Sequence, residues 1–450
     1  MRMFAVLGAF AASFGIAGLL SAQSTSSSSA PQAGSTRAAP AAASSKENIN
    51  LNDPTGIAVA SYVGDQDKLG MVASTPADGA DVIARALRER SLYQLDLSNK
   101  TVAACSDASR IGSSSASMQC AFVLAGNKWL VNDIAGWAKT MQALKTLAYP
   151  KLVQQVGKLL HRDPATLKIN EFEVAPDYTP FFDVPAVSVL RKAEAFDLPL
   201  QQQPVSADGR LTVYATTVSM NGHPVQMVFD TGAPMVLIDA GAAKTLQVDT
   251  VYPNFIVLPG GDYASLGIVR RFKLGSVDIS NMPVAISSKP LKFPLLGLSA
   301  MQYLGAFRIH GDTLHSAAGG LADCTTPMDM ATAVNGTGQT FLARGTVNGE
   351  PFPFVVSTGL PDTITRSHYG QPNASVSAKP YQVMSAFGTE YAWVSIGHAS
   401  MQVGEAPVAD PEYQVVYHAG HTRFRYYTGA GYIRQHDLVM DFKRGMMCLK

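Results

Sequence analysis

The sequence has little charge and almost no excess of either sign. Only 15% of its 450 residues are Asp, Glu, Lys or Arg, and the formal net charge is +1. The lack of a basic excess argues against a nucleic-acid partner, and the lack of a charged tail argues against a strongly charged protein partner. Hydrophobic residues make up 47% of the chain, which excludes a disordered protein and provides enough material for several buried cores.

The N-terminus has the pattern of an export signal. Arg2 is followed by an apolar run over residues 3–20 and then by the small residues Ser21 and Ala22, so the pattern predicts a signal peptide over residues 1–22. The run is also close to the shortest length that spans a bilayer, so an uncleaved anchor stays open, and only then do we expect membrane attachment. Residues 23–49 are rich in Ser and Ala and predict a disordered linker. We therefore expect a periplasmic or secreted protein.

Cysteine is scarce, and its four positions match no metal motif. There is no Cys-x-x-Cys pair and no nearby His pair, so we expect neither a metal site nor a cofactor. An even, small number of cysteines in an exported chain predicts disulfides. Three connectivities are possible, and we favour pairing within each half of the chain, as Cys105–Cys120 and Cys324–Cys448.

Residues 50–169 predict a small α+β domain, to which the sequence assigns no role. The apolar spacing predicts helices over 78–89, 137–147 and 152–160 and a β-hairpin over 120–134 that turns at Gly126-Asn127. The next segment, residues 170–207, is rich in Pro and acidic residues and predicts a connector.

An internal repeat follows. Residues 221–234 (NGHPVQMVFDTGAP) and 348–361 (NGEPFPFVVSTGLP) align without a gap, and seven of the 14 positions are identical. In each copy an Asn-Gly pair predicts a tight hairpin turn, and an apolar run predicts a buried strand that ends at Asp-Thr-Gly or Ser-Thr-Gly. A repeat at this spacing predicts two similar domains in tandem, over 208–318 and 319–450.

A second pair of segments strengthens the repeat. Gly297 lies 67 residues after Asp230, and Gly429 lies 72 residues after Ser357. Each glycine precedes a short helix-like stretch and then a strand-like run. The two copies therefore share spacing as well as a motif.

The run Val228-Phe229-Asp230-Thr231-Gly232-Ala233, followed downstream by Leu295-Leu296-Gly297, resembles the retropepsin/pepsin group of aspartic peptidases. The resemblance covers roughly residues 208–450. It implies a mostly β fold in which two tandem aspartic-peptidase-like β lobes enclose an interlobe cleft, here preceded by the small α+β domain. It also implies that an extended peptide or an unfolded protein is the substrate.

The resemblance assigns roles to named residues. Asp230 would be one of two carboxylates that flank a catalytic water, Thr231 would brace the lobes, and Gly232 would let the two loops pack closely. Thr358 and Gly359 would play the same parts in the second loop. In the stretch 259–263, the residues Gly260, Gly261 and Tyr263 would form the tip of a β-hairpin flap, with a plain surface turn as the alternative.

The partner of Asp230 departs from the family pattern, because the matching position is Ser357. Three hypotheses follow: a non-catalytic pseudopeptidase that binds peptides or proteins, a weak hydrolase that uses Asp230 alone, and a homodimer that pairs two Asp230 lobes. We expect a monomer rather than a homodimer. Asp362 lies five residues beyond Ser357, past the tight turn, and we do not expect it to replace the missing carboxylate. The sequence thus predicts an exported, aspartic-peptidase-like protein that binds extended peptides, with hydrolysis left open.

Overall fold

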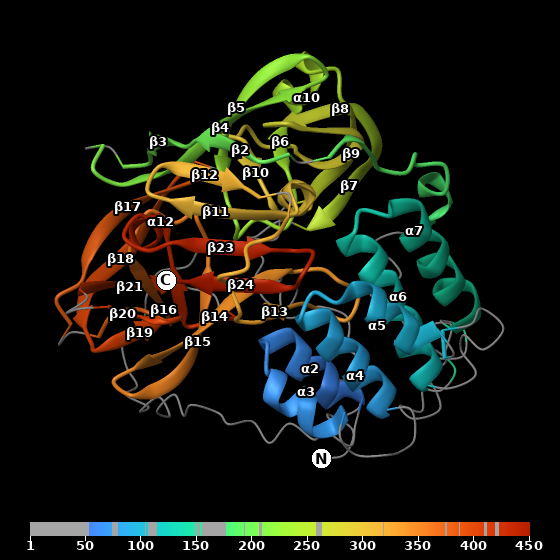
Figure 1. Cartoon of the computed structure of the whole chain (residues 1–450), viewed down its shortest axis with the longest axis horizontal. Coiled ribbons are helices and arrows are strands. Elements are labelled where there is room, and N and C mark those ends of the chain that lie inside the picture. The colour runs from blue at the N-terminus through green and yellow to red at the C-terminus, as the bar shows by residue number, and fades with distance from the viewer. Residues whose placement is uncertain are drawn as a thin grey trace, which may run out of the picture.

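The computed structural model describes the chain in ranges, which are residues 54–73, 80–103, 105–106, 115–148, 150, 154, 177–192, 194–206, 209–257, 263–317, 319–373, 376–386, 388–408, 412–418 and 423–450. Three parts follow one another along the chain: a group of helices, a first β lobe and a second β lobe (Figure 1). The predicted signal peptide, the linker 23–49, Gly260, Gly261 and, apart from Gln154, the helix expected over 152–160 lie outside the described residues.

The described residues of 54–148 form helices. The predicted helices over 78–89 and 137–147 are confirmed by α4 and by α7 with its π-helical extension. No described helix is long and apolar enough to cross a membrane. The elements are α2 (Pro54–Val63), α3 (Gln66–Ala73), α4 (Ala80–Ser91), α5 (Leu95–Ala103), α6 (Ser115–Leu130), α7 (Ile134–Ala143) and the π-helical η2 (Leu144–Ala148).

The β-hairpin predicted over 120–134 is wrong, because α6 runs through Gly126 and Asn127 without a turn. Phe122 and its neighbours are buried, and a short apolar run of this kind is common to buried strands and buried helices. Gly126 allows close packing instead of a turn, since a Cβ atom there would lie 2.6 Å from the carbonyl oxygen of Val334. In its described residues the domain is therefore helical and not α+β.

Lobe 1 is built on a nine-stranded sheet. Its order is β1-β9-β6-β10-β5-β4-β8-β7, with β3 beside β4. The segment predicted as a connector contributes β1 and β3 to this sheet. The elements are β1 (Ser188–Arg191), β3 (Gln201–Pro204), β4 (Thr212–Met220), β5 (His223–Phe229), β6 (Leu237–Asp239), α10 (Ala240–Thr245), β7 (Asp249–Val257), β8 (Tyr263–Leu274), β9 (Val277–Ser287) and β10 (Leu295–Leu296).

Lobe 2 is built on a ten-stranded sheet. Its order is β17-β18-β21-β16-β22-β15-β14-β19-β20, with β13 beside β14. The strands are β13 (Met330–Ala331), β14 (Thr340–Val347), β15 (Glu350–Val356), β16 (Ile364–Tyr369), β17 (Lys379–Ser385), β18 (Gly388–His398), β19 (Met401–Val403), β20 (Ala406–Val408), β21 (Glu412–His418) and β22 (Tyr426–Thr428). The predicted mostly β fold with two β lobes is therefore confirmed.

Both predicted Asn-Gly turns are confirmed. Asn221 and Gly222 have φ angles of 50° and 90°, and Asn348 and Gly349 have 51° and 82°. Asn tolerates this left-handed region better than most residues, and Gly adopts it freely. The turns join β4 to β5 and β14 to β15 as two-residue hairpins, which fixes the register of the strands that lead to Asp230 and Ser357.

A five-stranded sheet joins the lobes. Strands β11 and β12 follow lobe 1, strands β23 and β24 end lobe 2, and β11 pairs antiparallel with β23, with Phe307 opposite Met440. Both of these side chains are fully buried. The order is β2-β12-β11-β23-β24, and the bounds are β2 (Phe196–Pro199), β11 (Ala306–His310), β12 (Thr313–Ser316), β23 (Leu438–Asp441) and β24 (Met446–Leu449).

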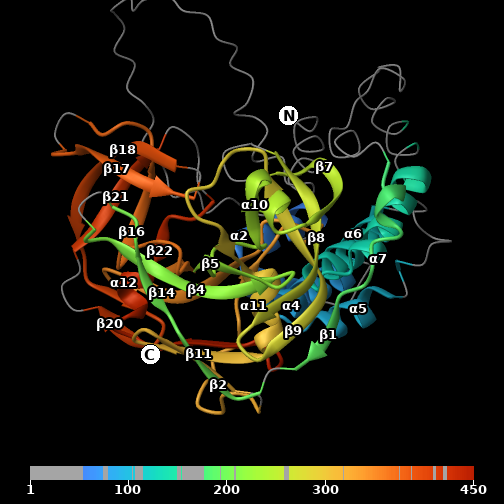
Figure 2. The same ribbon diagram turned by 90° about the horizontal axis from the view of Figure 1, so that it is seen from above.

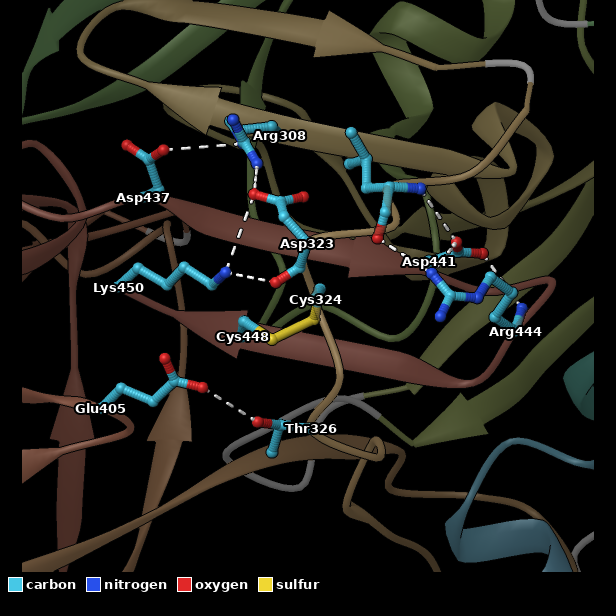
Figure 3. The surroundings of a disulfide bond; sticks show 11 residues. Arg308, Asp323, Cys324, Thr326, Glu405, Asp437, Asp441, Arg444, Cys448 and Lys450 are labelled. Atoms are coloured by element: carbon cyan, nitrogen blue, oxygen red, sulfur yellow. Dashed lines mark hydrogen bonds and ion pairs between the residues drawn. A yellow bond between two sulfur atoms is a disulfide. The ribbon is translucent and has the colours of Figure 1, made fainter.

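Two disulfides confirm the favoured pairing. Cys105–Cys120 ties the end of α5 to α6, and Cys324–Cys448 ties the start of lobe 2 to β24. Figure 3 shows that charged groups surround the second disulfide, where Asp323 contacts both Arg308 and Lys450. The disulfide and the ion pair of Lys450 thus attach the C-terminal end of the chain to the start of lobe 2.

The helical domain packs against both lobes. Figure 2 shows α6 and α7 beside the lobe 1 strands β8 and β9, and the hydrophobic core of the helices includes Leu266 and Ile268 from β8. Arg90 is fully buried and links the helices to lobe 2. Within the helical domain it donates to Asn127 Oδ1 (2.6 Å) and to the carbonyl oxygen of Val123 (2.5 Å). In lobe 2 it donates to the carbonyl oxygens of Ala333 (3.1 Å) and Val334 (2.8 Å). Burial among these uncharged acceptors lowers the pKa of Arg90 to about 9.

We predict that Arg90→Met lowers the free energy of unfolding by at least about 3 kcal/mol, because several buried acceptors lose their donor at once. Urea unfolding followed by circular dichroism measures the change. Arg191 is exposed in an ion pair with Glu194, so Arg191→Met should change stability by less than about 0.5 kcal/mol. Equal stability of the two variants would contradict the role of Arg90.

Candidate active site

Asp230 and Ser357 lie at matching positions in the two lobes. In lobe 1, β5 pairs in parallel with β10, and the backbone N–H of Asp230 donates to the carbonyl oxygen of Leu296 (3.0 Å). In lobe 2, β15 pairs in parallel with β22, and the N–H of Ser357 donates to the carbonyl oxygen of Thr428 (3.0 Å). The same backbone arrangement therefore presents both side chains.

Two glycines make this arrangement possible. A Cβ atom at Gly297 would lie 2.2 Å from the carbonyl oxygen of Met235, and one at Gly429 would lie 2.3 Å from that of Asp362. Any side chain at either position would clash with backbone. The Gly297 and Gly429 positions in the sequence thus mark where the chain passes tightly against the loop that follows the Asp230 or Ser357 motif, before the helices α11 (Leu298–Met301) and α12 (Ala430–Ile433) begin.

Thr231 and Thr358 lock the two loops together. The N–H of each donates to the Oγ1 of the other, at 3.0 and 3.1 Å. Thr231 Oγ1 then donates to the carbonyl oxygen of Val356 (2.9 Å), and Thr358 Oγ1 donates to that of Phe229 (2.5 Å). Both threonines are fully buried, so every bond is made away from water. The sequence motif did not reveal the two acceptor carbonyls, because backbone acceptors carry no residue signature.

The lock brings Ser357 against Asp230. The Ser357 hydroxyl donates to Asp230 Oδ1 at 2.9 Å, and the same oxygen accepts from the N–H of Gly232 (2.7 Å) and Gly359 (3.0 Å). A Cβ atom at Gly232 would lie 2.4 Å from Ser357 Oγ, and one at Gly359 would lie 2.3 Å from Asp230 Cγ. Both glycines therefore permit the contact. All three donors bind Oδ1, and none of these three binds Oδ2.

Burial and hydrogen bonding act on Asp230 in opposite directions. Burial raises the pKa of the carboxyl, and the donors from Gly232, Ser357 and Gly359 lower it, with burial the larger effect. Asp230 therefore keeps its proton to a higher pH than an exposed aspartate does. The described residues include no group of three side chains that could hold a metal ion.

The predicted flap lies mostly outside the described residues. Tyr263 is the first residue of β8 and pairs with Val257 of β7, so residues 258–262 connect the two strands of a hairpin. The backbone arrangement at Tyr263 fits a hairpin. The role of this stretch as a flap stays a prediction.

Comparison with known proteins finds a family model that matches lobe 1. Residues 216–303, which include Asp230 and Gly297, match the family model described as "gag-polyprotein putative aspartyl protease". Lobe 1 therefore resembles the retropepsin-like aspartic peptidases. No curated protein matches the sequence.

Three solved structures that are similar to this chain cover different shares of it. A retropepsin-like aspartic protease from Rickettsia conorii is 18% identical over 29% of this chain and 92% of its own, with a TM-score of 0.22. Basic 7S globulin from soybean is 11% identical over 57% and 95%, with a TM-score of 0.33. Conglutin gamma from lupine seeds is 12% identical over 58% and 95%, with a TM-score of 0.35.

The site formed by the two loops thus holds one carboxylate, from Asp230, and one hydroxyl, from Ser357. Two carboxylates so close together share a proton, which lets one act as base and the other as acid. A serine hydroxyl remains neutral through the pH range in which carboxyls titrate. Ser357 can therefore donate to Asp230 but cannot alternate with it as acid and base.

We predict that Asp230→Asn becomes more stabilising, relative to the wild type, as pH rises from about 3 to about 7. The raised pKa means that the folded wild type binds its proton more tightly than the unfolded chain does. Ionisation above the unfolded pKa of about 3.9 therefore costs the folded state stability, and Asn avoids this cost. Thermal unfolding of both proteins across this range measures the difference.

A matched control has the opposite sign. Arg271 lowers the pKa of Asp278, so ionisation stabilises the fold there, and Asp278→Asn should lose relative stability as pH rises. The same pH trend in both variants would contradict the assignment for Asp230.

Proposed function

We propose that this protein binds extended peptide segments between its two lobes, at the loops of Asp230 and Ser357, and that it hydrolyses them slowly or not at all. The observation that carries the proposal is the 2.9 Å hydrogen bond from Ser357 Oγ to Asp230 Oδ1. The hydroxyl occupies the place beside Asp230 where the mechanism needs a second carboxyl group. This is the pseudopeptidase hypothesis, and it allows at most slow hydrolysis through Asp230.

The expected loss of rate follows from the chemistry. Hydrolysis of a peptide bond requires a base for the water and an acid for the carbonyl oxygen. Asp230 Oδ2 can serve as the base, but Ser357 is too weak an acid to replace a protonated carboxyl group. Losing one member of a catalytic group commonly lowers the rate by about 10⁴-fold, which corresponds to about 5 kcal/mol.

Binding does not depend on the missing carboxylate. An extended peptide binds chiefly through main-chain hydrogen bonds to strand edges, and its alternate side chains enter pockets. The Thr231–Thr358 lock fixes the two loops through contacts within the chain itself. A preformed site of this kind loses little entropy when the peptide binds.

We also propose that the protein acts outside the cytoplasm, in the periplasm or after secretion, as a monomer. The two disulfides suit an oxidising compartment, and the N-terminal 22 residues have the pattern of a signal peptide. Peptides and unfolded proteins of that compartment are then the partners. Lobe 2 of the same chain places Ser357 beside Asp230, so the proposed site needs no second copy of the chain.

We predict that Ser357→Asp creates measurable cleavage of casein at acid pH, because it restores two carboxyl groups within one hydrogen bond of each other. Asp230→Ala and the double variant Asp230→Ala/Ser357→Asp should be inactive. The wild type should bind fluorescein-labelled casein, followed by fluorescence anisotropy, with cleavage at or near background.

Two outcomes would overturn the proposal. Rapid cleavage by the wild type that Asp230→Ala abolishes would make the protein a single-aspartate peptidase. Absence of casein binding by both the wild type and a folded Ser357→Asp variant would exclude a peptide site between the lobes.

A further inference from the structure

Asp362 carries a carboxylate that the site chemistry does not use. It lies in the loop between Ser357 and β16, and its side chain is partly buried. Gln414 Nε2 donates to Oδ1 at 2.7 Å, and Thr365 Oγ1 donates to Oδ2 at 3.2 Å. The two donors hold the carboxylate in one orientation, but neither carries a charge.

The strand register places this carboxylate on the same side of lobe 2 as Ser357. Thr365 pairs with both Gln414 and Tyr427, and Tyr427 pairs with Val355. Residues paired across neighbouring strands share one face of a sheet, and side chains alternate along each strand. Val355 precedes Ser357 by two residues, so the face that bears Thr365 and Gln414 continues to the Ser357 side chain.

This row of side chains is open at its outer end. Val355 is buried at 4% exposure, Thr365 and Gln414 are half-buried, and Ile396, which pairs with Gln414, is 54% exposed. Asp362, itself partly exposed, therefore lies beside a row of side chains whose exposure increases towards Ile396.

The charge of Asp362 is not neutralised within the described part of the chain. None of the ion pairs between described residues includes Asp362, and burial raises the pKa of its carboxyl to about 6. At neutral pH the group is ionised and holds two neutral partners. A carboxylate has lone pairs for about four hydrogen bonds, so it retains capacity for a cationic donor.

The two lobes differ at this point. The residue of lobe 1 at the same place after Asp230 is Met235, which is buried and belongs to the core shared with the helical domain. Only the lobe 2 side of the site thus presents a carboxylate at this position. A ligand bound across both loops would meet an apolar residue on one side and an anion on the other.

We propose that Asp362 is a specificity-determining residue that binds the cationic side chain of a Lys or Arg residue in the bound peptide. Gln414 and Thr365 position the carboxylate, and the peptide supplies the charge that the chain does not. The proposal rests on the proposed peptide-binding function and names its substrate class: extended segments with a basic residue near the Ser357 side of the site. A hydrogen bond to a charged group of this kind increases affinity by about tenfold.

The test uses fluorescein-labelled extended peptides of Ala, Ser and Thr in which a single Lys, Gln or Glu is moved from position to position. Fluorescence anisotropy with the mature wild-type protein should find a position where Lys binds about tenfold more tightly than Gln, and Glu more weakly than Gln. Asp362→Asn should reduce the Lys preference to less than about twofold while the affinity for the Gln peptide stays the same. Glu350→Gln removes the same charge from an exposed position at the other end of β15 and should leave the preference intact.

The outcomes separate specificity from structure and from the proposed function. A Lys preference that persists in Asp362→Asn would overturn the role of Asp362. Equal weakening of the Lys and Gln peptides, with a lowered melting temperature, would make the carboxylate a structural acceptor for Gln414 and Thr365 and would also overturn it. Binding of all three peptides with equal affinity by the wild type refutes only the specificity, whereas binding of none refutes the peptide site itself.

Discussion

The reciprocal hydrogen bonds between Thr231 and Thr358 are the constraint on which the site depends. Each threonine is fully buried, and the N–H and Oγ1 of each form hydrogen bonds to the opposite lobe. A buried polar group that loses its partner costs about 1–3 kcal/mol, so the two loops cannot separate without several such losses. The contact between Asp230 and Ser357 follows from this lock, as does the requirement for glycine at 232 and 359.

The helical domain extends this constraint to the whole molecule. Arg90 binds it to lobe 2 through the carbonyl oxygens of residues 333–334. Towards lobe 1, the rings of Trp137, Phe181 and Tyr252 form a continuous series, with centroids 5.7 and 4.9 Å apart, that ends on β7. The helices therefore brace the base of the β7–β8 hairpin and the start of lobe 2 at once. A domain with such contacts acts as part of the two-lobed body and not as a separate module on a flexible tether.

The sequence predicted those features that local motifs specify. The Asn-Gly turns, the glycines of the two loops and the pairing of Asp230 with Ser357 all follow from the repeat, since each needs a particular residue at a particular place. The helix α6 was missed because its apolar run suits a buried strand equally well and because Gly126 and Asn127 resemble a turn. Both residues are explained by contacts with distant parts of the sequence, because Gly126 allows the approach of Val334 and Asn127 accepts from Arg90. The strands in the connector and the Gln414–Asp362 bond were also out of reach, because both depend on partners far away in the sequence.

The replacement of a carboxylate by Ser357 alters the energetics of the lock as well as its chemistry. Two buried carboxyl groups at hydrogen-bonding distance repel one another when both ionise, and the folded state bears that cost wherever they do not share a proton. Ser357 removes the repulsion and adds a donor to Oδ1, while the threonine and glycine contacts around it remain intact. Active sites commonly sacrifice stability for function, so a hydroxyl at this position is expected to strengthen the lobe–lobe contact at the expense of hydrolysis. The same exchange that weakens the peptidase chemistry therefore favours a rigid, preformed surface for binding.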